Sequence, residues 1–281
     1  MRFSLEGDEL TNNRIRGEQD GYRRKIDGLQ QLQEAGGRDL GFAVVIQDEN
    51  VEHLLPLYEL TQKMGVELAT STLHNAWQFY KNDNYFYDRK KVARQVEHII
   101  TAMMRGNSVK NWFRAYLNLG LIEKILGHPR LIPCVAGTGF AFIDPWADVW
   151  ACNVRTDLPL GNLARQSWNE IVSSEQARAS IGKVAACTQN CWMVTTARTA
   201  MRSSIAPQLP KLGPAIWVLV NKLRTLLGSD IPYEKYIDYT QVEQSPMVQR
   251  ESYLGKRNKV TVKRDRKTVA ERYPLLDFDN H

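Results

Sequence analysis

All four cysteines of this chain lie within 58 residues, and this constrains the fold more than any other feature of the sequence. Cys134 and Cys152 have seventeen residues between them, whereas Cys187 and Cys191 have three. Two separated thiolate pairs suit an iron–sulfur cluster, whose ligands come from backbone segments that bend around it. Structural zinc sites usually present two tight C-x2-4-C pairs, and only the second pair has that form. The spacing therefore favours a [4Fe-4S] cluster, with zinc or unliganded buried cysteines as alternatives.

The bulk composition is that of a globular protein. A chain of 281 residues can bury the core of one large or two modest domains. No apolar run approaches the roughly 20 residues of a membrane span, and Glu6 and Asp8 come too early for a signal peptide. We therefore expect a cytoplasmic protein, and in that reducing compartment grouped cysteines favour metal over disulfides. The sequence has no phosphate-binding loop, dinucleotide fingerprint or H-E-x-x-H motif.

The first 126 residues alternate between short β-type runs and amphipathic stretches, which predicts βα units around a parallel sheet. Expected strands cover 3–5, 40–46 and 66–70, the second being apolar enough for burial on both faces. Expected helices cover 22–35, a segment capped by Asn50, a segment from an Asp88 cap to Gly106, and 109–126.

Residues 127–205 have a turn-rich composition and form a second predicted domain. Residues 140–152 predict a β-hairpin with its turn at 144–148. A helix with Trp168 and Ile171 follows, and another extends from the last cysteine pair through Met201.

Residues 206–281 are predicted to form an amphipathic helix and a basic tail. Residues 214–227 place Ile216, Trp217, Val220, Leu223 and Leu227 at helical spacing, and we expect docking onto the core rather than onto a membrane surface. Residues 250–272 carry nine Lys or Arg against three acidic residues. This run predicts a solvated tail with no specific nucleic-acid partner.

Several segments of the cysteine-bearing half together resemble one known domain. They are Cys134-Val135-Ala136-Gly137, the hairpin ending at Cys152, Leu160-Gly161-Asn162-Leu163, Trp168-Asn169-Glu170-Ile171 and Cys187-x3-Cys191. They resemble the SPASM or twitch extension of radical S-adenosylmethionine (radical SAM) enzymes. The resemblance implies one auxiliary [4Fe-4S] cluster bound by all four cysteines. Ala147 departs from the pattern, since a glycine commonly precedes the second cysteine there.

The first third resembles the fourth strand of the radical SAM barrel and the segment after it. The matching residues are Phe3-Ser4-Leu5-Glu6-Gly7 and Arg14-Ile15-Arg16-Gly17. By this resemblance Ser4, Glu6 and Arg16 would lie near S-adenosylmethionine, although polar residues at a sheet rim are often simply solvated. The expected fold is α/β: a partial radical SAM (β/α) barrel with strands resembling the fourth to sixth, followed by a small α+β SPASM/twitch domain.

Radical SAM chemistry needs a C-x3-C-x2-C motif, and this sequence does not contain one. We therefore predict an N-terminally truncated oxidoreductase or maturase, from a truncated or split gene or a late start codon. Alone it should not cleave S-adenosylmethionine, which it would bind only with the missing N-terminal half supplied. Expected partners are that half chain or an electron donor.

The alternative is a non-catalytic iron–sulfur or zinc module that completes its sheet with a partner chain. Its interface would use the sheet edge and the aromatic residues Trp77, Phe79, Tyr80 and Phe86. Neither interpretation indicates a substrate.

Overall fold

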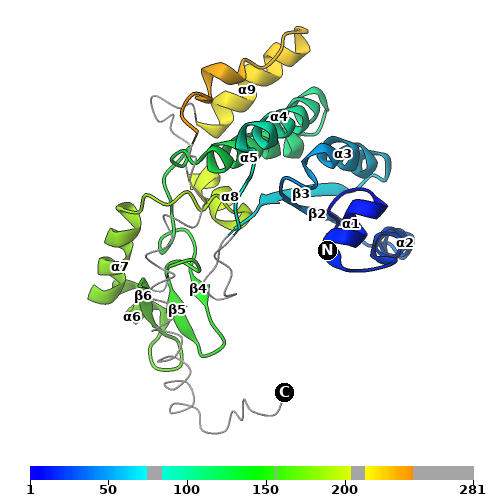
Figure 1. Cartoon of the computed structure of the whole chain (residues 1–281). Helices are drawn as coiled ribbons and strands as arrows, with labels where there is room; N and C mark the ends of the chain where they lie inside the picture. Colours follow the sequence, from blue (N-terminus) through cyan, green and yellow to red (C-terminus); the bar gives the residue numbers. More distant parts are fainter. Residues whose placement is uncertain (75–83, 156, 204–212, 243–281) are drawn as a thin grey trace. The chain divides into compact units, whose positions relative to one another are not determined.

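A computed structural model of the chain describes residues 1–74, 84–155, 157–203 and 213–242. Three parallel strands form its first sheet in the order β1-β2-β3, namely β1 (Arg2–Ser4), β2 (Gly41–Ile46) and β3 (Glu67–Thr72). Figure 1 shows this sheet between the N-terminal helices and a pair of long helices. The three predicted parallel strands are therefore confirmed.

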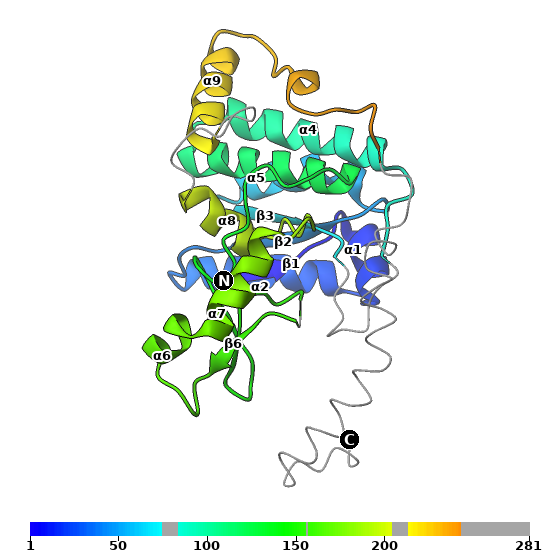
Figure 2. The same cartoon turned by 90° about the vertical axis from the view of Figure 1, so that its left-hand side faces the viewer.

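Helices follow each strand of this sheet. They are α2 (Gly21–Glu34), which packs on β1, α3 (Leu54–Lys63), which packs on β2 and β3, α4 (Arg89–Arg105) and α5 (Val109–Leu126). The helices α4 and α5 pack along each other (Figure 2). The Asp88 side chain accepts from the Lys91 N–H at 2.9 Å and caps α4, which ends at Gly106 as predicted.

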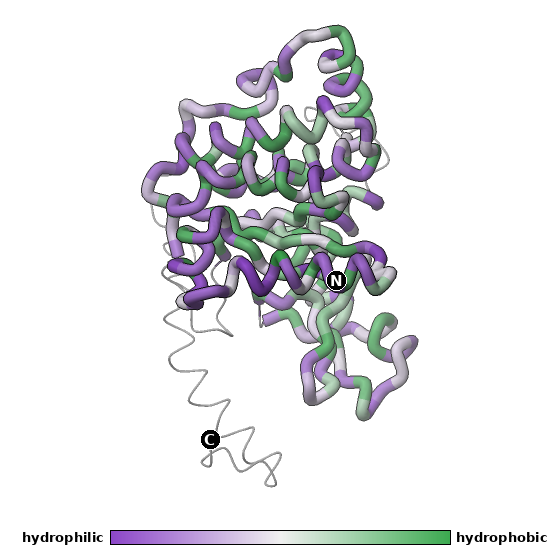
Figure 3. The backbone as a smooth tube through the Cα atoms, turned by 90° about the vertical axis from the view of Figure 1, so that its right-hand side faces the viewer, coloured by the Kyte–Doolittle hydropathy of each residue, from purple (hydrophilic) through white to green (hydrophobic). Residues whose placement is uncertain are grey.

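Strand β2 is covered more fully on one face than on the other. Phe42, Val44 and Ile46 are buried, whereas Ala43 and Val45 between them are half-buried. Successive side chains of a strand point to opposite faces, so Ala43 and Val45 share the less covered face. The prediction of burial on both faces is wrong for this reason. Apolar residues follow the strands closely in the hydropathy view of Figure 3.

Two local features differ from the sequence-based expectations. A further helix, α1 (Glu9–Arg16), begins at Asp8, whose carboxylate accepts from the Thr11 N–H at 2.8 Å, and ends at Gly17 with φ of 65°. Asn50 makes no side-chain cap. Its amide instead donates to the Val45 carbonyl at 2.9 Å, ahead of the short helix η1 (Val51–His53). The Asn50 side chain, which was expected to cap the next helix, therefore stabilises the loop after β2 instead.

The cysteine region, defined here as residues 134–192, contains a second, antiparallel sheet. Its elements are β4 (Phe142–Ile143), β5 (Asp148–Trp150), β6 (Pro159–Asn162), α6 (Trp168–Ser173) and α7 (Glu175–Ala185). The predicted hairpin is confirmed, because Asp144 and Asp148 close its turn with a backbone hydrogen bond of 3.0 Å. Ser167 and Glu170 form a capping box at the start of α6.

Helix α8 (Val194–Ser203) follows the last cysteine, and α9 (Pro214–Leu226) packs on α4 and α5 before the short helix η3 (Tyr233–Lys235). In α9 Trp217 is 1% exposed, whereas Leu223 and Leu227 are 51% and 83% exposed. The helix docks as expected, but Trp217 is the one residue of the predicted apolar side that is buried. The core also takes Val218 and the polar Asn221 and Lys222, which were not part of the predicted apolar side.

The amino-acid segments 75–83 and 243–281 lie outside the described residues, and with them Trp77, Phe79, Tyr80 and the basic tail. Phe86 is described and buried, so it does not offer the interface side chain that the alternative function expected. Among the described residues, none of the helices is both long and apolar enough to span a membrane.

Candidate metal centre

The four cysteines, which are far apart in the sequence, line one cavity. Cys134, Cys152, Cys187 and Cys191 share its wall with mainly apolar side chains and with Arg130 and Arg155. The cavity volume is about 30 Å³.

A tight turn positions Cys134. The Gly139 N–H donates to the Val135 carbonyl at 2.7 Å, and Gly137 within this turn has φ of 80°. A Cβ atom at Gly137 would lie only 3.0 Å from Ile181 and 3.1 Å from Ala151. Both the backbone conformation and the close packing thus favour glycine at this position.

The hairpin positions Cys152 two residues after the end of β5. Its Sγ accepts from the Val154 N–H at 3.3 Å. In the hairpin turn Ala147 has φ of 62°, a conformation that favours glycine. Ala147 therefore has a strained backbone at the position where the resemblance leads us to expect glycine.

Cys187 and Cys191 lie on an irregular segment between α7 and α8. Trp192 anchors this segment, because its buried indole Nε1 donates to the Leu117 carbonyl of α5 at 2.7 Å. Gly120 of α5 gives the ring its space, since a Cβ atom there would lie 2.0 Å from Trp192. The last cysteine is therefore held next to a side chain that is seated on the long helix.

Burial raises the pKa of the Cys191 thiol, whereas the charges of Lys124 and Arg130 act to lower it. Burial raises the pKa of Cys152 and raises the pKa of Cys191 to about 12. Asp157 and then Cys187 hold the Arg155 pKa above its ordinary value. Arg155 donates to the Asp157 carboxylate through Nε at 3.0 Å and Nη2 at 2.6 Å. A fixed guanidinium therefore faces the cysteine cavity.

Within the described residues, no group of three or more His, Cys, Asp or Glu side chains is placed to hold a metal ion as it stands. The donor set nevertheless fits an iron–sulfur cluster, because four soft sulfur atoms border one enclosed and largely apolar space. A zinc ion would need all four sulfur atoms at about 2.3 Å from one point.

Glu6 and Arg16, two of the three residues predicted to lie near S-adenosylmethionine, are in contact. Arg16 Nη2 donates to Glu6 Oε1 at 2.7 Å, and Glu6 Oε2 accepts from the Val45 N–H at 3.0 Å. The buried carboxylate thus extends the hydrogen bonding of β2 beyond the end of β1. Ser4 lies half-buried on β1, opposite Ala43. A ligand-binding role for these three residues stays a prediction.

Comparison with known families identifies the cysteine region. Residues 134–192 match the SPASM family model, described as an iron–sulfur cluster-binding domain. The chain carries a SPASM domain. This match confirms the resemblance inferred from the cysteine-bearing half, and it spans all four cysteines. No protein of curated function matches the chain.

Solved structures share a more distant similarity that extends over most of the chain. The structure of hexahistidine-tagged anSMEcpe with bound AdoMet has 13% sequence identity and a TM-score of 0.45, and the match covers 84% of this chain and 66% of that one. Native anSMEcpe with bound AdoMet and Kp18Cys peptide has 13% identity and a TM-score of 0.42, over 81% and 67% of the two chains. The chain thus spans about two thirds of these proteins, and similarity at this level does not establish a common fold.

The cations around the SPASM cysteines were not among the predicted site residues. Arg130 lies over the Trp192 ring with its Cζ 5.3 Å from the ring centroid, and Arg155 lies beside Cys187. Arg155 follows Cys152 by three residues, and this proximity was the available signal. Arg130 precedes Cys134 by four residues, but only the fold brings it to Cys191 and Trp192.

Proposed function

We propose that the SPASM domain binds one auxiliary [4Fe-4S] cluster through Cys134, Cys152, Cys187 and Cys191. The observation that carries this proposal is the shared cavity lined by all four cysteines inside the matched domain. With every iron ligated by protein, such a cluster would exchange single electrons and leave no iron open to substrate.

The chain's own residues would have three tasks at this site. The turn at Gly137 and the hairpin at Ala147 orient Cys134 and Cys152. The buried thiols hold their protons, so cluster binding must release them. Arg155, fixed by Asp157, places positive charge beside the resulting thiolates and compensates part of their negative charge.

Anaerobic reconstitution of the full chain with iron and sulfide tests the cluster. We expect close to four iron and four sulfide per chain and a broad absorbance near 400 nm. Each of the variants C134S, C152S, C187S and C191S should lose most of this iron. The variant A186S, an exposed neighbour of Cys187, should retain it. A well-folded product that binds one zinc and no sulfide would contradict the proposal.

We further propose that the sheet of β1, β2 and β3 belongs to a radical SAM barrel whose C-x3-C-x2-C motif lies outside the residues of this sequence. The support is the resemblance of residues 3–7 and 14–17 and the parallel βα arrangement that these residues begin. In that setting Ser4, Glu6 and Arg16 would lie near S-adenosylmethionine. The reduced, cluster-loaded chain alone should yield no 5′-deoxyadenosine, and co-expression with a chain that carries the motif should restore its formation. Cleavage by this chain alone would be inconsistent with the proposal.

A non-catalytic module remains the second candidate because β1 is an edge strand of the described sheet. A partner chain could extend the sheet there by backbone pairing. This candidate predicts a stable complex, with or without the three-cysteine motif in the partner, that forms no 5′-deoxyadenosine under reducing conditions. Formation of 5′-deoxyadenosine by the complex would exclude it.

A further inference from the structure

A second and much larger cavity lies away from the cysteines, between β3, α5 and α8. Its volume is about 600 Å³, which is within the usual range for small-molecule sites. Figures 1 and 2 both show α8 beside α5 and β3. Its apolar lining comes from all three elements: Leu68, Phe113, Leu117, Val194 and Met201. The cavity therefore offers an apolar surface to a ligand.

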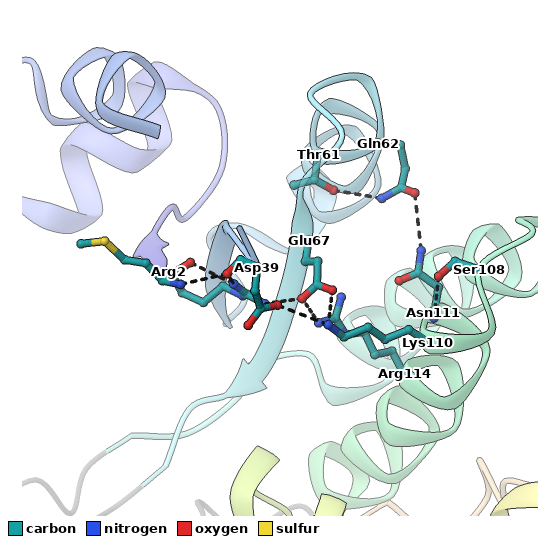
Figure 4. Close-up of polar contacts among 10 residues, drawn as sticks. Arg2, Asp39, Thr61, Gln62, Glu67, Ser108, Lys110, Asn111 and Arg114 are labelled. Carbon is teal, nitrogen blue, oxygen red and sulfur yellow. Dashed lines mark hydrogen bonds and ion pairs between the residues drawn. The ribbon is translucent and has the colours of Figure 1, made fainter. Parts of the chain in front are cut away.

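One side of this cavity carries an ion-pair network. Arg2, Lys110 and Arg114 surround the carboxylates of Asp39 and Glu67 (Figure 4). Arg114 Nη2 lies 2.6 Å from Glu67 Oε2, and Arg2 Nη2 lies 2.9 Å from Asp39 Oδ1. Three cations thus share two carboxylates, and one positive charge is left over.

Helix α8 adds two further cations to the lining. Arg198 and Arg202 are four residues apart, so they share one face of the helix. Both are exposed, and the salt bridges formed among the described residues involve neither of them. Among the described residues, these five Lys and Arg side chains therefore exceed the two carboxylates of the network by three charges.

Arg114, one of the lining residues, also has a hydrogen-bond donor without an acceptor. Arg114 Nη1 is buried and has no hydrogen-bond partner among the described residues, although Nη2 of the same guanidinium is paired. A buried donor left without a partner costs about 1–3 kcal/mol, and more when it is charged. An anionic oxygen atom would satisfy such a donor with a strong, charge-assisted hydrogen bond.

We propose that this cavity binds an amphiphilic organic anion, namely a medium-chain carboxylate. Its carboxylate would pair with the cations of α8 and α5, and its hydrocarbon chain would lie against Phe113, Leu117 and Met201. Burial of the chain supplies affinity in proportion to apolar area, whereas the cations select the charged head group. This cavity shares no lining residue with the cavity of the four cysteines.

Calorimetric titration of the full chain with octanoate tests this site. We expect saturable 1:1 binding that weakens as salt is raised from about 50 to 500 mM, because exposed arginines are screened. Octanol lacks the charge and acetate lacks the chain, so each should bind at least tenfold more weakly. Absence of saturable octanoate binding, or equal binding of octanol, would overturn the proposal.

Charge-matched variants assign the binding to this cavity. The double variant R198Q/R202Q should weaken octanoate binding at least tenfold. The control R165Q/R178Q removes two exposed arginines that do not line the cavity, so its affinity for octanoate should be unchanged. F113A, at a residue 39% exposed, should weaken octanoate binding without loss of folding. Equal affinity in the two double variants would place the binding elsewhere and overturn the assignment.

Discussion

The parallel-sheet region and the cysteine region bury very different cores. Between β1 and α5 the fully buried side chains are large, and they include Phe42, Leu68, Ile99 and Met103. The core of the cysteine region contains three alanines among its eight buried residues, and its strands have two to four residues. The first region can be stable through apolar packing, whereas the second has little apolar area to offset the entropy of ordering its chain.

This difference indicates what the cysteines contribute to the fold. Small domains that cannot bury a sufficient core commonly depend on metal sites or cross-links. The partly buried Cys134 and Cys152 pack against the small core, so they join the apolar packing to the candidate metal centre. We therefore expect the cysteine region to depend on its cluster for stability and the sheet region to depend on side-chain packing.

The largest effect is expected from a variant that disrupts the packing of the sheet region. Phe42 is fully buried in β2, and F42A should lower the free energy of unfolding by about 3–5 kcal/mol. The equivalent change in the cysteine region is I171A. In the cluster-loaded protein, I171A should lower the free energy of unfolding by less than removal of the cluster does. Urea unfolding followed by circular dichroism measures both variants. A larger loss for I171A than for cluster removal would contradict the comparison.

A smaller effect tests the contact between the two regions. In G120A the new methyl group would collide with Trp192, which neighbours Cys191, so we expect a loss of about 1–3 kcal/mol and altered cluster absorbance. The control G182A places the same methyl group in open space within α7 and should stabilise by about 0.5–1 kcal/mol. Thermal unfolding and the visible spectrum distinguish them, and equal behaviour of the two variants would mean that Trp192 does not couple the regions.

The pH dependence of the cluster-free protein is expected to reveal the buried thiols. Unfolded cysteine has a pKa near 8.5, whereas burial raises the pKa of folded Cys191 to about 12. The folded state therefore holds the proton more tightly, and this contribution to stability is fully present below about pH 8.5 and is lost as pH rises toward 12. Urea unfolding between pH 8 and 11 measures the loss. The free energy of unfolding should fall less steeply with pH in C191A than in the unchanged protein. Identical slopes in these two proteins would count against a buried thiol.

The smallest expected effect concerns the hairpin. Ala147 has a positive φ, so A147G should stabilise the cysteine region by about 0.5–1 kcal/mol through relief of backbone strain. Hydrogen exchange of the hairpin amides, compared between A147G and the unchanged protein, measures this gain. Faster exchange in A147G would show that the loss of chain entropy outweighs the strain.

Local signals in the sequence were sufficient to predict where many helices and turns begin and end. Asp88 and Gly106 bound α4, and residues 144–148 form the predicted turn, because caps and turns depend on neighbouring residues. Helix α1 was missed although Asp8 and Gly17 carry the usual cap signals, since its apolar positions are few. For Asn50 the cap pattern was present, but a hydrogen bond to β2 competed for the same side chain.

The sequence by itself determined the parallel strands, the hairpin and the cysteine pairs of the SPASM domain, because these follow from residue periodicity, turn chemistry and thiol spacing. Only the tertiary structure decided that Arg130 meets Trp192, that α9 buries Asn221 and Lys222 rather than its leucines, and that Arg2, Lys110 and Arg198 line one cavity. Those contacts join residues far apart in the chain. They depend on how helices pack, and no local pattern of residues encodes that.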